Sequence, residues 1–285
     1  PWVPVLCGDA GRFAGLPWTS IGSLFAWRRS LLPGGAPPDD WETFRATGRD
    51  LKARGRPVGQ SFGPSGGDPA AFAYPFLWSW GGRDVAADGR SIAIASRETV
   101  ESVRFLQALW QEAFDPAGLD WTDTSNNRAF LSGALSGTVN NASIWFDARR
   151  ARAPLFDDIL FATLPRGPAG SFTLPVLQSN MVMGYSANRD AAKALLRWLH
   201  APANYGRFLE SQAGFSTPCT TVWEGAPQWN ATPALAPFRL AARLGGAPGR
   251  DRSIVPRMYA RALRGASPAE AVAWAEARLR EAPAG

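Results

Sequence analysis

Two adjacent amides, Asn140 and Asn141, stand at the end of a short apolar run in the stretch NNRAFLSGALSGTVNNASIWF, residues 126–146. The run follows a helix-like segment that ends in glycine, and the apolar triplet IWF comes soon after the amides. A buried asparagine costs free energy unless its donors and acceptors are matched. We therefore predict that the amides bind hydroxyl groups of a ligand, or that they cap the helix SIWFDARR that follows, or that each amide does one of these.

Tryptophans beside small polar residues are a second feature with chemical meaning. The chain holds 13 tryptophans, and the stretches LPWTS, FLWSWGG and NNASIWF place Trp18, Trp78, Trp80 and Trp145 next to Thr19, serine or asparagine. A tryptophan face can stack on the C–H face of a sugar ring while amides and hydroxyls match its OH groups. The pattern predicts a binding surface for a neutral polyol, with three of these tryptophans (18, 78 and 145) as its floor or wall.

Motifs of common catalytic and metal sites lack their partners. The stretch GPSGG, residues 63–67, has the spacing of a serine-hydrolase nucleophile turn, but its proline and glycines predict a plain loop. His200, the only histidine, falls in the last turn of a helix, where a cation or donor is favoured. Cys7 and Cys219 match no metal or redox spacing, and they either form one disulfide or remain buried thiols. We expect no metal and no cofactor.

The charge pattern argues against a nucleic-acid partner. The formal net charge is +6, but the basic residues are scattered beside acids, as in WETFRATGRDLKARGR, which is typical of solvated helix faces. The longest apolar runs, such as AFAYPFLWSW, are shorter than the roughly 20 residues that cross a bilayer, so no transmembrane helix is expected. The first residues have no Met, no basic start and no apolar core, so we expect a chain cut from a longer one rather than a signal peptide.

Capping residues and apolar periodicity predict the elements that position these groups. The stretch PPDDWETFRATGRDLKARG reads as a helix that begins at Asp39 or Asp40 and stops at Gly55. SPAEAVAWAEARLREA begins with a capping box of Ser267 and Glu270. Short strand-like runs such as SLFAW, TVNN and LPVLQSNMVMGYS fall among the helices, so we predict an α/β protein. Three further tryptophans at helical spacing are predicted to lie in the core: Trp41, Trp110 and Trp198.

A series of stretches follows the order and spacing of one protein family. GRFAGLPWTSIGSLFAWRRSLL and GGAPPDDWETFRATGRDLKARGRPVG come first, followed by FLWSWGG, AFLSGALSGTVNNASIW, DDILFATLPRGPAG and AAKALLRWLHAPANYGRFLESQAGFSTP. Together they resemble the family 1 extracellular solute-binding proteins of bacterial ATP-binding-cassette (ABC) importers, of the carbohydrate type, over essentially all of the chain. Departures from the family pattern at Asn140, Asn141 and Phe215 fall at expected cleft positions and leave the ligand open.

The resemblance implies a two-lobe, periplasmic-binding-protein-like (class II) α/β fold, here a C-terminal lobe plus part of the N-terminal lobe. It assigns residues 1–17 to the tail of the N-terminal lobe, 18–171 to the C-terminal lobe, 172–222 to a returning segment of the N-terminal lobe, and 223–285 to the completion of the C-terminal lobe. The two lobes of such a fold close over a ligand by a hinge motion. With an upstream segment missing, we expect exposed apolar residues in the returning segment: Leu195, Leu199, Tyr205, Phe208 and Leu209.

The function implied by the resemblance is capture of a sugar or related polyol outside the cytoplasm, by a periplasmic or lipid-anchored monomer. The protein would then deliver the ligand to permease subunits of an ABC transporter without catalysis. The predicted ligand-binding residues are Trp18, Thr19, Trp78, Trp80, Asn140, Asn141, Trp145, Gln178, Asn180 and Phe215. The alternative is a glycoside-acting enzyme, which needs two carboxylates about 5 to 10 Å apart. Its candidate carboxylates are Asp84, Asp123 and Asp147.

Overall fold

The computed structural model of the chain describes residues 8–9, 12–13, 15–223, 232–235, 237–238 and 251–281. The helices are α2 (Trp41–Ala53), α3 (Asp68–Ser79), α4 (Arg97–Ala113), α5 (Ser125–Leu131), α6 (Ser143–Ala151), α7 (Arg189–His200), α8 (Pro202–Gln212), α11 (Ile254–Leu263) and α12 (Pro268–Glu281). The strands are β1 (Gly8–Asp9), β2 (Arg12–Phe13), β3 (Leu16–Ile21), β4 (Leu24–Arg28), β5 (Val58–Gly59), β6 (Gly137–Asn140), β7 (Ile159–Ala162), β8 (Val176–Asn180) and β9 (Thr217–Pro218).

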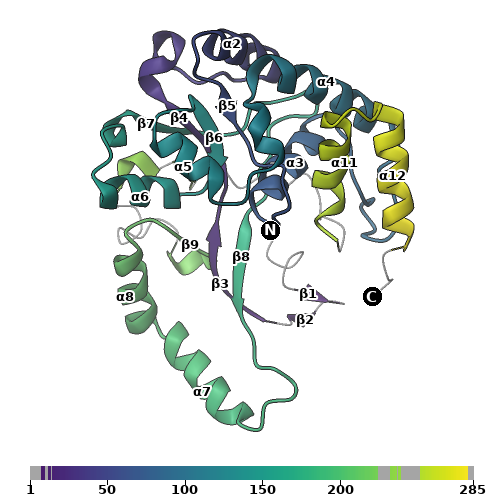
Figure 1. Ribbon diagram of the computed structural model, residues 1–285. Helices are drawn as coiled ribbons and strands as arrows, with labels where there is room; N and C mark the ends of the chain where they lie inside the picture. The colour runs from purple at the N-terminus through teal and green to yellow at the C-terminus, as the bar shows by residue number, and fades with distance from the viewer. Residues whose placement is uncertain are drawn as a thin grey trace.

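A four-stranded sheet forms the centre of the larger, upper part of the molecule (Figure 1). Its strand order is β5-β6-β4-β7, with β4 antiparallel to β6 and β7 and with β5 parallel to β6. Leu24, the first residue of β4, lies opposite Asn140, the last residue of β6. Gly59 at the end of β5 lies opposite Thr138. The carboxyl ends of β5 and β6 therefore share one edge of this sheet with the start of β4.

A three-stranded sheet of order β8-β3-β9 extends below, and α7 and α8 lie beside it (Figure 1). Strand β3 pairs antiparallel with both neighbours, and Ile21 at its end lies opposite Val176. Only residues 22 and 23 separate β3 from β4, so Ile21 is within about 10 Å of Leu24 along the chain. One end of the small sheet therefore lies next to the edge of the large sheet that carries Asn140.

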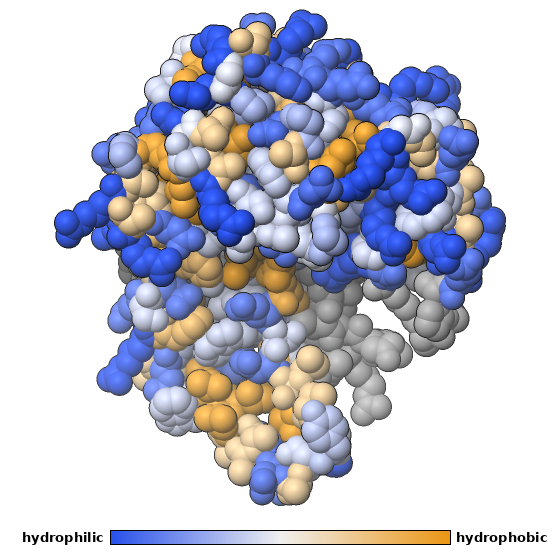
Figure 2. All heavy atoms as spheres, in the orientation of Figure 1, coloured by the Kyte–Doolittle hydropathy of each residue, from blue (hydrophilic) through white to orange (hydrophobic). Residues whose placement is uncertain are grey.

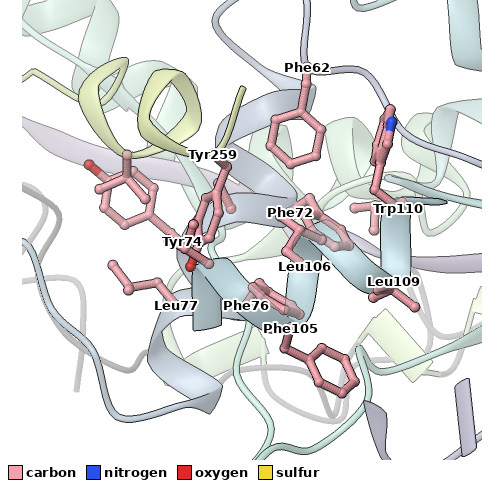
Figure 3. Close-up of a cluster of buried hydrophobic side chains, with 14 of the residues drawn as sticks. Phe62, Phe72, Tyr74, Phe76, Leu77, Phe105, Leu106, Leu109, Trp110 and Tyr259 are labelled. Atoms are coloured by element: carbon pink, nitrogen blue, oxygen red, sulfur yellow. The ribbon is translucent and has the colours of Figure 1, made fainter. Parts of the chain in front are cut away.

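The main core gathers around α3, which is apolar on nearly all of its faces and buried between α2, α4 and α11. Figure 3 shows part of this core, in which aromatic rings from several elements point toward one another. Ten of these buried side chains are labelled in it: Phe62, Phe72, Tyr74, Phe76, Leu77, Phe105, Leu106, Leu109, Trp110 and Tyr259. A helix that is hydrophobic all round belongs in the interior of a protein, which explains why α3 is covered on several sides.

Two of the three tryptophans predicted at helical spacing are core residues, and the third is not. Trp41 and Trp110 are buried, which confirms the prediction. Trp198 is 60% exposed, and α7, which carries it, has no fully buried residue. The helical period correctly identified one apolar face of α7, but periodicity alone does not state what covers that face.

The apolar surface predicted for residues 172–222 is only partly present. Leu195 on α7 is exposed, as expected, and apolar side chains gather over the lower part of the molecule (Figure 2). Tyr205 and Leu209 are buried instead, because the ring of Tyr205 packs against Trp18 and Trp223. The prediction was wrong for these two residues, since α8 folds back onto β3.

The helix caps form as the sequence indicates. Asp40 accepts a hydrogen bond from the backbone N–H of Thr43 at 2.8 Å and begins α2. At α12, the Ser267 hydroxyl accepts from the N–H of Glu270, and the Glu270 carboxylate accepts from the N–H of Ser267 at 2.9 Å. This reciprocal pair confirms the predicted capping box.

We expect Ser267→Ala to lower the free energy of unfolding by about 1 kcal/mol, because the first turn of α12 loses its acceptor. Urea unfolding of the two proteins measures the difference. Ser211→Ala removes an exposed hydroxyl from the last turn of α8 and serves as control, with a change expected within about 0.5 kcal/mol. Equal losses in both variants would contradict the capping role.

Candidate functional site

The site begins with Asn140, whose side chain is bonded at both ends. Its Nδ2 donates to Asn127 Oδ1 on α5, and its Oδ1 accepts from the backbone N–H of Asn141 at 3.0 Å and from the Ser143 hydroxyl at 3.3 Å. Asn140 is only 5% exposed. It therefore holds Asn127 and Asn141 in position at the edge of the sheet.

Asn141 lies one residue before Ala142, the N-cap of α6, and satisfies the first N–H of that helix. Its Oδ1 accepts from the N–H of Ser143, the first residue of α6, at 2.8 Å. No hydrogen bond among the described residues uses Asn141 Nδ2 or Asn127 Nδ2, and both residues are partly exposed. Asn127, Asn140 and Asn141, here called the amide cluster, thus present unused N–H donors at the edge that faces the small sheet.

Thr19 and Gln178 form the matching polar pair on the small sheet. The Thr19 hydroxyl donates to Gln178 Oε1 at 2.7 Å, across the pairing of β3 with β8. Gln178 is exposed, and its two amide N–H donors, on Nε2, take part in no hydrogen bond within the described ranges. The structure therefore brings these two predicted residues together, on strands that run toward the amide cluster.

Asn180 lies too far along β8 to join them. It pairs with Leu16, whereas Val176, four residues earlier, pairs with Ile21 near the large sheet. Four residues of strand span about 13 Å, so Asn180 is near the end of β8 that is remote from the amide cluster. The prediction that it lines the same site is not supported by this placement.

The three tryptophans predicted to form one aromatic surface lie in three separate clusters. Trp18 packs with Tyr205 and Phe208 on the side of β3 that α8 covers. Trp78 is 2% exposed within the core around α3, so the prediction that it contacts ligand is wrong. Ser79 beside it in sequence suggested a polar surface, but the segment is a helix that is buried on nearly all sides, so Trp78 lies in the core.

Trp145 is the one of the three that lies close in sequence to the amide cluster. It is buried on α6, where its ring contacts Phe146, Phe156 and the guanidinium of Arg149, the last at 5.6 Å from the ring centroid. Most of its surface is thus covered by protein. Its predicted contact with ligand stays a prediction.

Phe215, from a segment about 70 residues later in the sequence, contacts the same helix, α6. Its ring centroid lies 5.5 Å from that of Phe146, in an edge-to-face arrangement, and it comes from the turn that follows α8. This contact joins the segment that leads into β9 with the helix that Asn141 caps. The structure therefore places Phe215 beside α6, and its contact with ligand stays a prediction.

Trp80 lies elsewhere, at the carboxyl end of α3. It lines a separate cavity of about 260 Å³ with Phe105, Arg166 and Pro168. The amino end of α3 is the end that approaches α5, where Asn127 lies, and the 12 residues of the helix span about 18 Å. Trp80 is therefore not brought together with the amide cluster.

The candidate carboxylates of the enzyme alternative each have another role. Asp84 is completely buried and accepts a hydrogen bond from the Tyr74 hydroxyl at 2.9 Å, so its predicted place in a cleft is wrong. Asp147 forms an ion pair with Arg150. Asp123 accepts from two backbone N–H groups at the start of α3. Each of the three carboxylates is therefore bonded to a group of the protein.

His200 ends α7, as predicted, and its partly buried position favours the neutral ring. Burial lowers the pKa of His200, and its ring packs edge-on against Trp18 at 5.0 Å. Across the described ranges, no three His, Cys, Asp or Glu side chains gather closely enough to hold a metal ion. None of the helices described is both long and apolar enough to cross a membrane. The possible pairing of Cys7 with Cys219 involves a residue outside the described part of the chain.

Asn127 is the site residue that the sequence analysis missed, together with its neighbour Asn126. Both lie in the first turn of α5, and the run TDTSNN contains the signal, because consecutive small polar residues at a helix start favour capping and exposed side chains. The sequence did not reveal their partners, because Asn126 reaches Thr138 and Asn127 reaches Asn140, each across a turn and a strand.

Several solved proteins have a similar structure. A search of curated protein sequences found no match. A solved sugar transporter from Arthrobacter chlorophenolicus A6 with bound laminaribiose aligns at a TM-score of 0.82 and 16% identity, over 100% of this chain and 76% of that one. Maltose-bound MalE3 of T. maritima aligns at 0.79 and 20% identity, over 99% and 75%. The GacH receptor of Streptomyces glaucescens GLA.O gives 0.79 and 20%, over 99% and 74%.

At these identities the structural likeness shows a common fold, the two-lobe α/β architecture that the resemblance implied. The sequence itself decides the family. Residues 4–237 match the sequence profile of the proteins described as bacterial extracellular solute-binding protein, which is most of the chain. This chain belongs to the bacterial extracellular solute-binding protein family.

Proposed function

We propose that this protein binds a sugar or related polyol between its four-stranded and three-stranded sheets and delivers it to the permease of an ABC importer. The observation that carries the proposal is the set of neutral N–H donors on Asn127, Asn141 and Gln178, at adjoining ends of the two sheets. Neutral amides match hydroxyl groups, whereas an anionic ligand is usually met by arginine or lysine. The donor set therefore favours an uncharged, hydroxyl-rich ligand.

Structures with the same fold support this ligand class. Those aligned above have bound laminaribiose, maltose or acarbose, and two others hold α-D-tagatose and ribitol. The family is one of binding proteins and is described as extracellular, which supports an extracytoplasmic location. We propose further that the protein is a monomer, either periplasmic or lipid-anchored, and that it has no enzymatic activity.

The division into lobes is part of the same proposal. Strands β8 and β9 and helices α7 and α8, all from residues 172–222, surround β3. Helices α11 and α12, from the final segment, pack on α3 and α4. This arrangement supports assigning residues 18–171 and 223–285 to one lobe and residues 1–17 and 172–222 to the other, except that residues 18–21 of β3 pair with β8 and β9 of the second lobe.

A ligand screen by thermal unfolding tests the function. We expect laminaribiose, maltose, tagatose or ribitol to raise the unfolding temperature, since a ligand at 100 times its Kd adds about 2.7 kcal/mol to the native state. Glucose 6-phosphate and glutamate serve as charged controls and should give no shift. Stabilisation by the anions alone would overturn the proposal.

A second readout separates binding from hydrolysis. Oligosaccharides incubated with the protein should be recovered unchanged, because each of the three candidate carboxylates, Asp84, Asp123 and Asp147, is bonded to a group of the protein. Release of shorter sugars would favour the glycoside-acting alternative instead.

A further inference from the structure

Unpaired buried oxygen atoms gather around the amino end of α3, next to the amide cluster. Within the described ranges, seven buried side-chain polar atoms have no hydrogen-bond partner, and more than half of them lie here: Gln60 Oε1, Ser65 Oγ, Asp68 Oδ2 and Asn126 Oδ1. Gln60 and Asn126 are 0% exposed. Apart from the serine hydroxyl, these atoms can only accept hydrogen bonds while Asp68 is ionised, so the group has a single donor for several acceptors.

Asp68 is the residue that connects this group. Its backbone oxygen accepts from Gln60 Nε2 at 3.0 Å, and its carboxyl group interacts with the side-chain amide of Asn126. Asn126 in turn donates from Nδ2 to Thr138 Oγ1 at 3.2 Å and to the carbonyl of Val139 at 3.3 Å. Asn126 thus links the Asp68 carboxyl to the end of β6 that carries Asn140.

No cation faces Asp68 from the described elements around it. The loop of residues 60–67 and strand β6 contain no ionisable residue. On α5, Arg128 turns its guanidinium to Thr124 and Ser125 at the surface. Among the described residues, the one charged group that acts on Asp68 is the carboxylate of Asp123, which accepts the backbone N–H of Asp68 at 2.9 Å. The charged residues before α11 act on Tyr74, further along α3.

This environment favours the neutral form of the carboxyl. Burial raises the pKa of Asp68 to about 7; the Asn126 amide opposes the shift, and the neighbouring Asp123 carboxylate adds to it. A proton on Oδ2 would convert the unpaired acceptor into a donor. A neutral carboxylic acid and a primary amide can then pair in both directions, N–H to oxygen and O–H to oxygen.

We propose that Asp68 is a positioning residue that is protonated on Oδ2 below neutral pH and pairs reciprocally with Asn126, thereby holding the end of β6 and the amide cluster in place. The pair accounts for two of the unpaired atoms, Asp68 Oδ2 and Asn126 Oδ1. Deprotonation leaves an unpaired buried charge beside Asp123 and removes the donor to Asn126. The consequence for ligand affinity rests on the proposed sugar-binding function, whereas the consequence for stability does not.

The sign of the pH effect follows from the shift. The folded state holds the proton of Asp68 up to about pH 7, whereas the unfolded chain releases it near its ordinary value of 3.8. The folded state therefore binds more protons between these values, so stability falls as pH rises through this window and levels off above it. The stabilising contribution of the proton is complete at low pH and lost above about pH 7.

Urea unfolding of the ligand-free protein between pH 5 and pH 8 tests the proposal. We expect the unfolding equilibrium constant to rise by as much as about tenfold per pH unit from pH 5 to 7, and then to level off. In Asp68→Asn this rise should be absent, because an amide cannot ionise and still pairs with Asn126. The trend that remains is the opposite one, since burial lowers the pKa of His200 and the folded state therefore gains stability as pH rises. Asp157→Asn, which removes an exposed carboxylate from a turn, should keep the slope of the natural protein.

The same dependence of the unfolding constant on pH in Asp68→Asn and in the natural protein would overturn the proposal. If Asp68→Asn does not fold, the natural protein labelled with carboxyl-13C aspartate gives a direct readout, with one carboxyl expected to titrate near pH 7. Titration of all aspartates below pH 5 would also overturn it. Stabilisation by millimolar Ca²⁺ at pH 8 that Asp68→Asn abolishes would assign the pocket to a metal ion in place of the proton.

The ligand arm uses the best sugar from the screen at pH 6 and pH 8. Its affinity should fall over this interval in the natural protein and stay constant in Asp68→Asn. If no sugar binds at either pH, the proposed function fails while the unfolding profile still decides the role of Asp68.

Discussion

Phe72→Ala is expected to lower the free energy of unfolding by about 3 to 5 kcal/mol. Phe72 is completely buried in the middle of α3, and its ring centroid lies 5.4 Å from that of Phe76, 5.6 Å from Phe62 and 5.9 Å from Phe114 (Figure 3). Truncation loses the favourable burial of the ring. It also leaves a cavity that the neighbouring rings, which lie on separate elements, cannot all move to fill. Urea unfolding followed by tryptophan fluorescence measures the loss.

Two further variants show whether the loss comes from the cavity. Phe72→Leu keeps most of the volume and should lose distinctly less than the alanine variant. Tyr185→Ala removes a ring that is 85% exposed and should change stability by no more than about 0.5 kcal/mol. A loss below about 1 kcal/mol for Phe72→Ala would mean that the core around α3 contributes little to the stability of the protein.

Asn140→Ala should weaken binding of the best sugar from the screen by about 5- to 150-fold, which corresponds to about 1 to 3 kcal/mol. Asn140 bonds to the side chain of Asn127 and to the backbone of Asn141, so its loss releases both amides that present donors. Part of the loss also comes from leaving Asn127 Oδ1 without its donor near a buried strand end. Isothermal titration calorimetry gives the affinity.

Asn141→Ala separates capping from binding. It removes the acceptor for the N–H of Ser143, so thermal stability should fall by about 0.5 to 2 kcal/mol, with a smaller loss of affinity than in Asn140→Ala. Asn188→Ala, an exposed asparagine before α7, is the matched control and should bind normally. Full affinity in a folded Asn140→Ala protein would show that the amide cluster is structural only.

The local elements were largely predictable from sequence because their signals are local. The capping box at Ser267, the Asp40 cap and the apolar period of α2 each lie within a few residues, and each forms as expected. The strand run TVNN also forms β6. The grouping of tryptophans was not predictable, because Trp18, Trp78 and Trp145 differ in what packs on them rather than in their neighbours in sequence.

The sequence by itself determined the element types, the family, and the presence of two amides where a strand meets a helix. The tertiary structure alone decided which side chains meet. Thr19 reaches Gln178 across 159 positions, and Asn140 reaches Asn127 through a turn that sequence periodicity does not specify. The physical reason is that capping and amphipathic patterns act over one or two turns of chain, whereas burial and side-chain hydrogen bonding depend on which elements pack together.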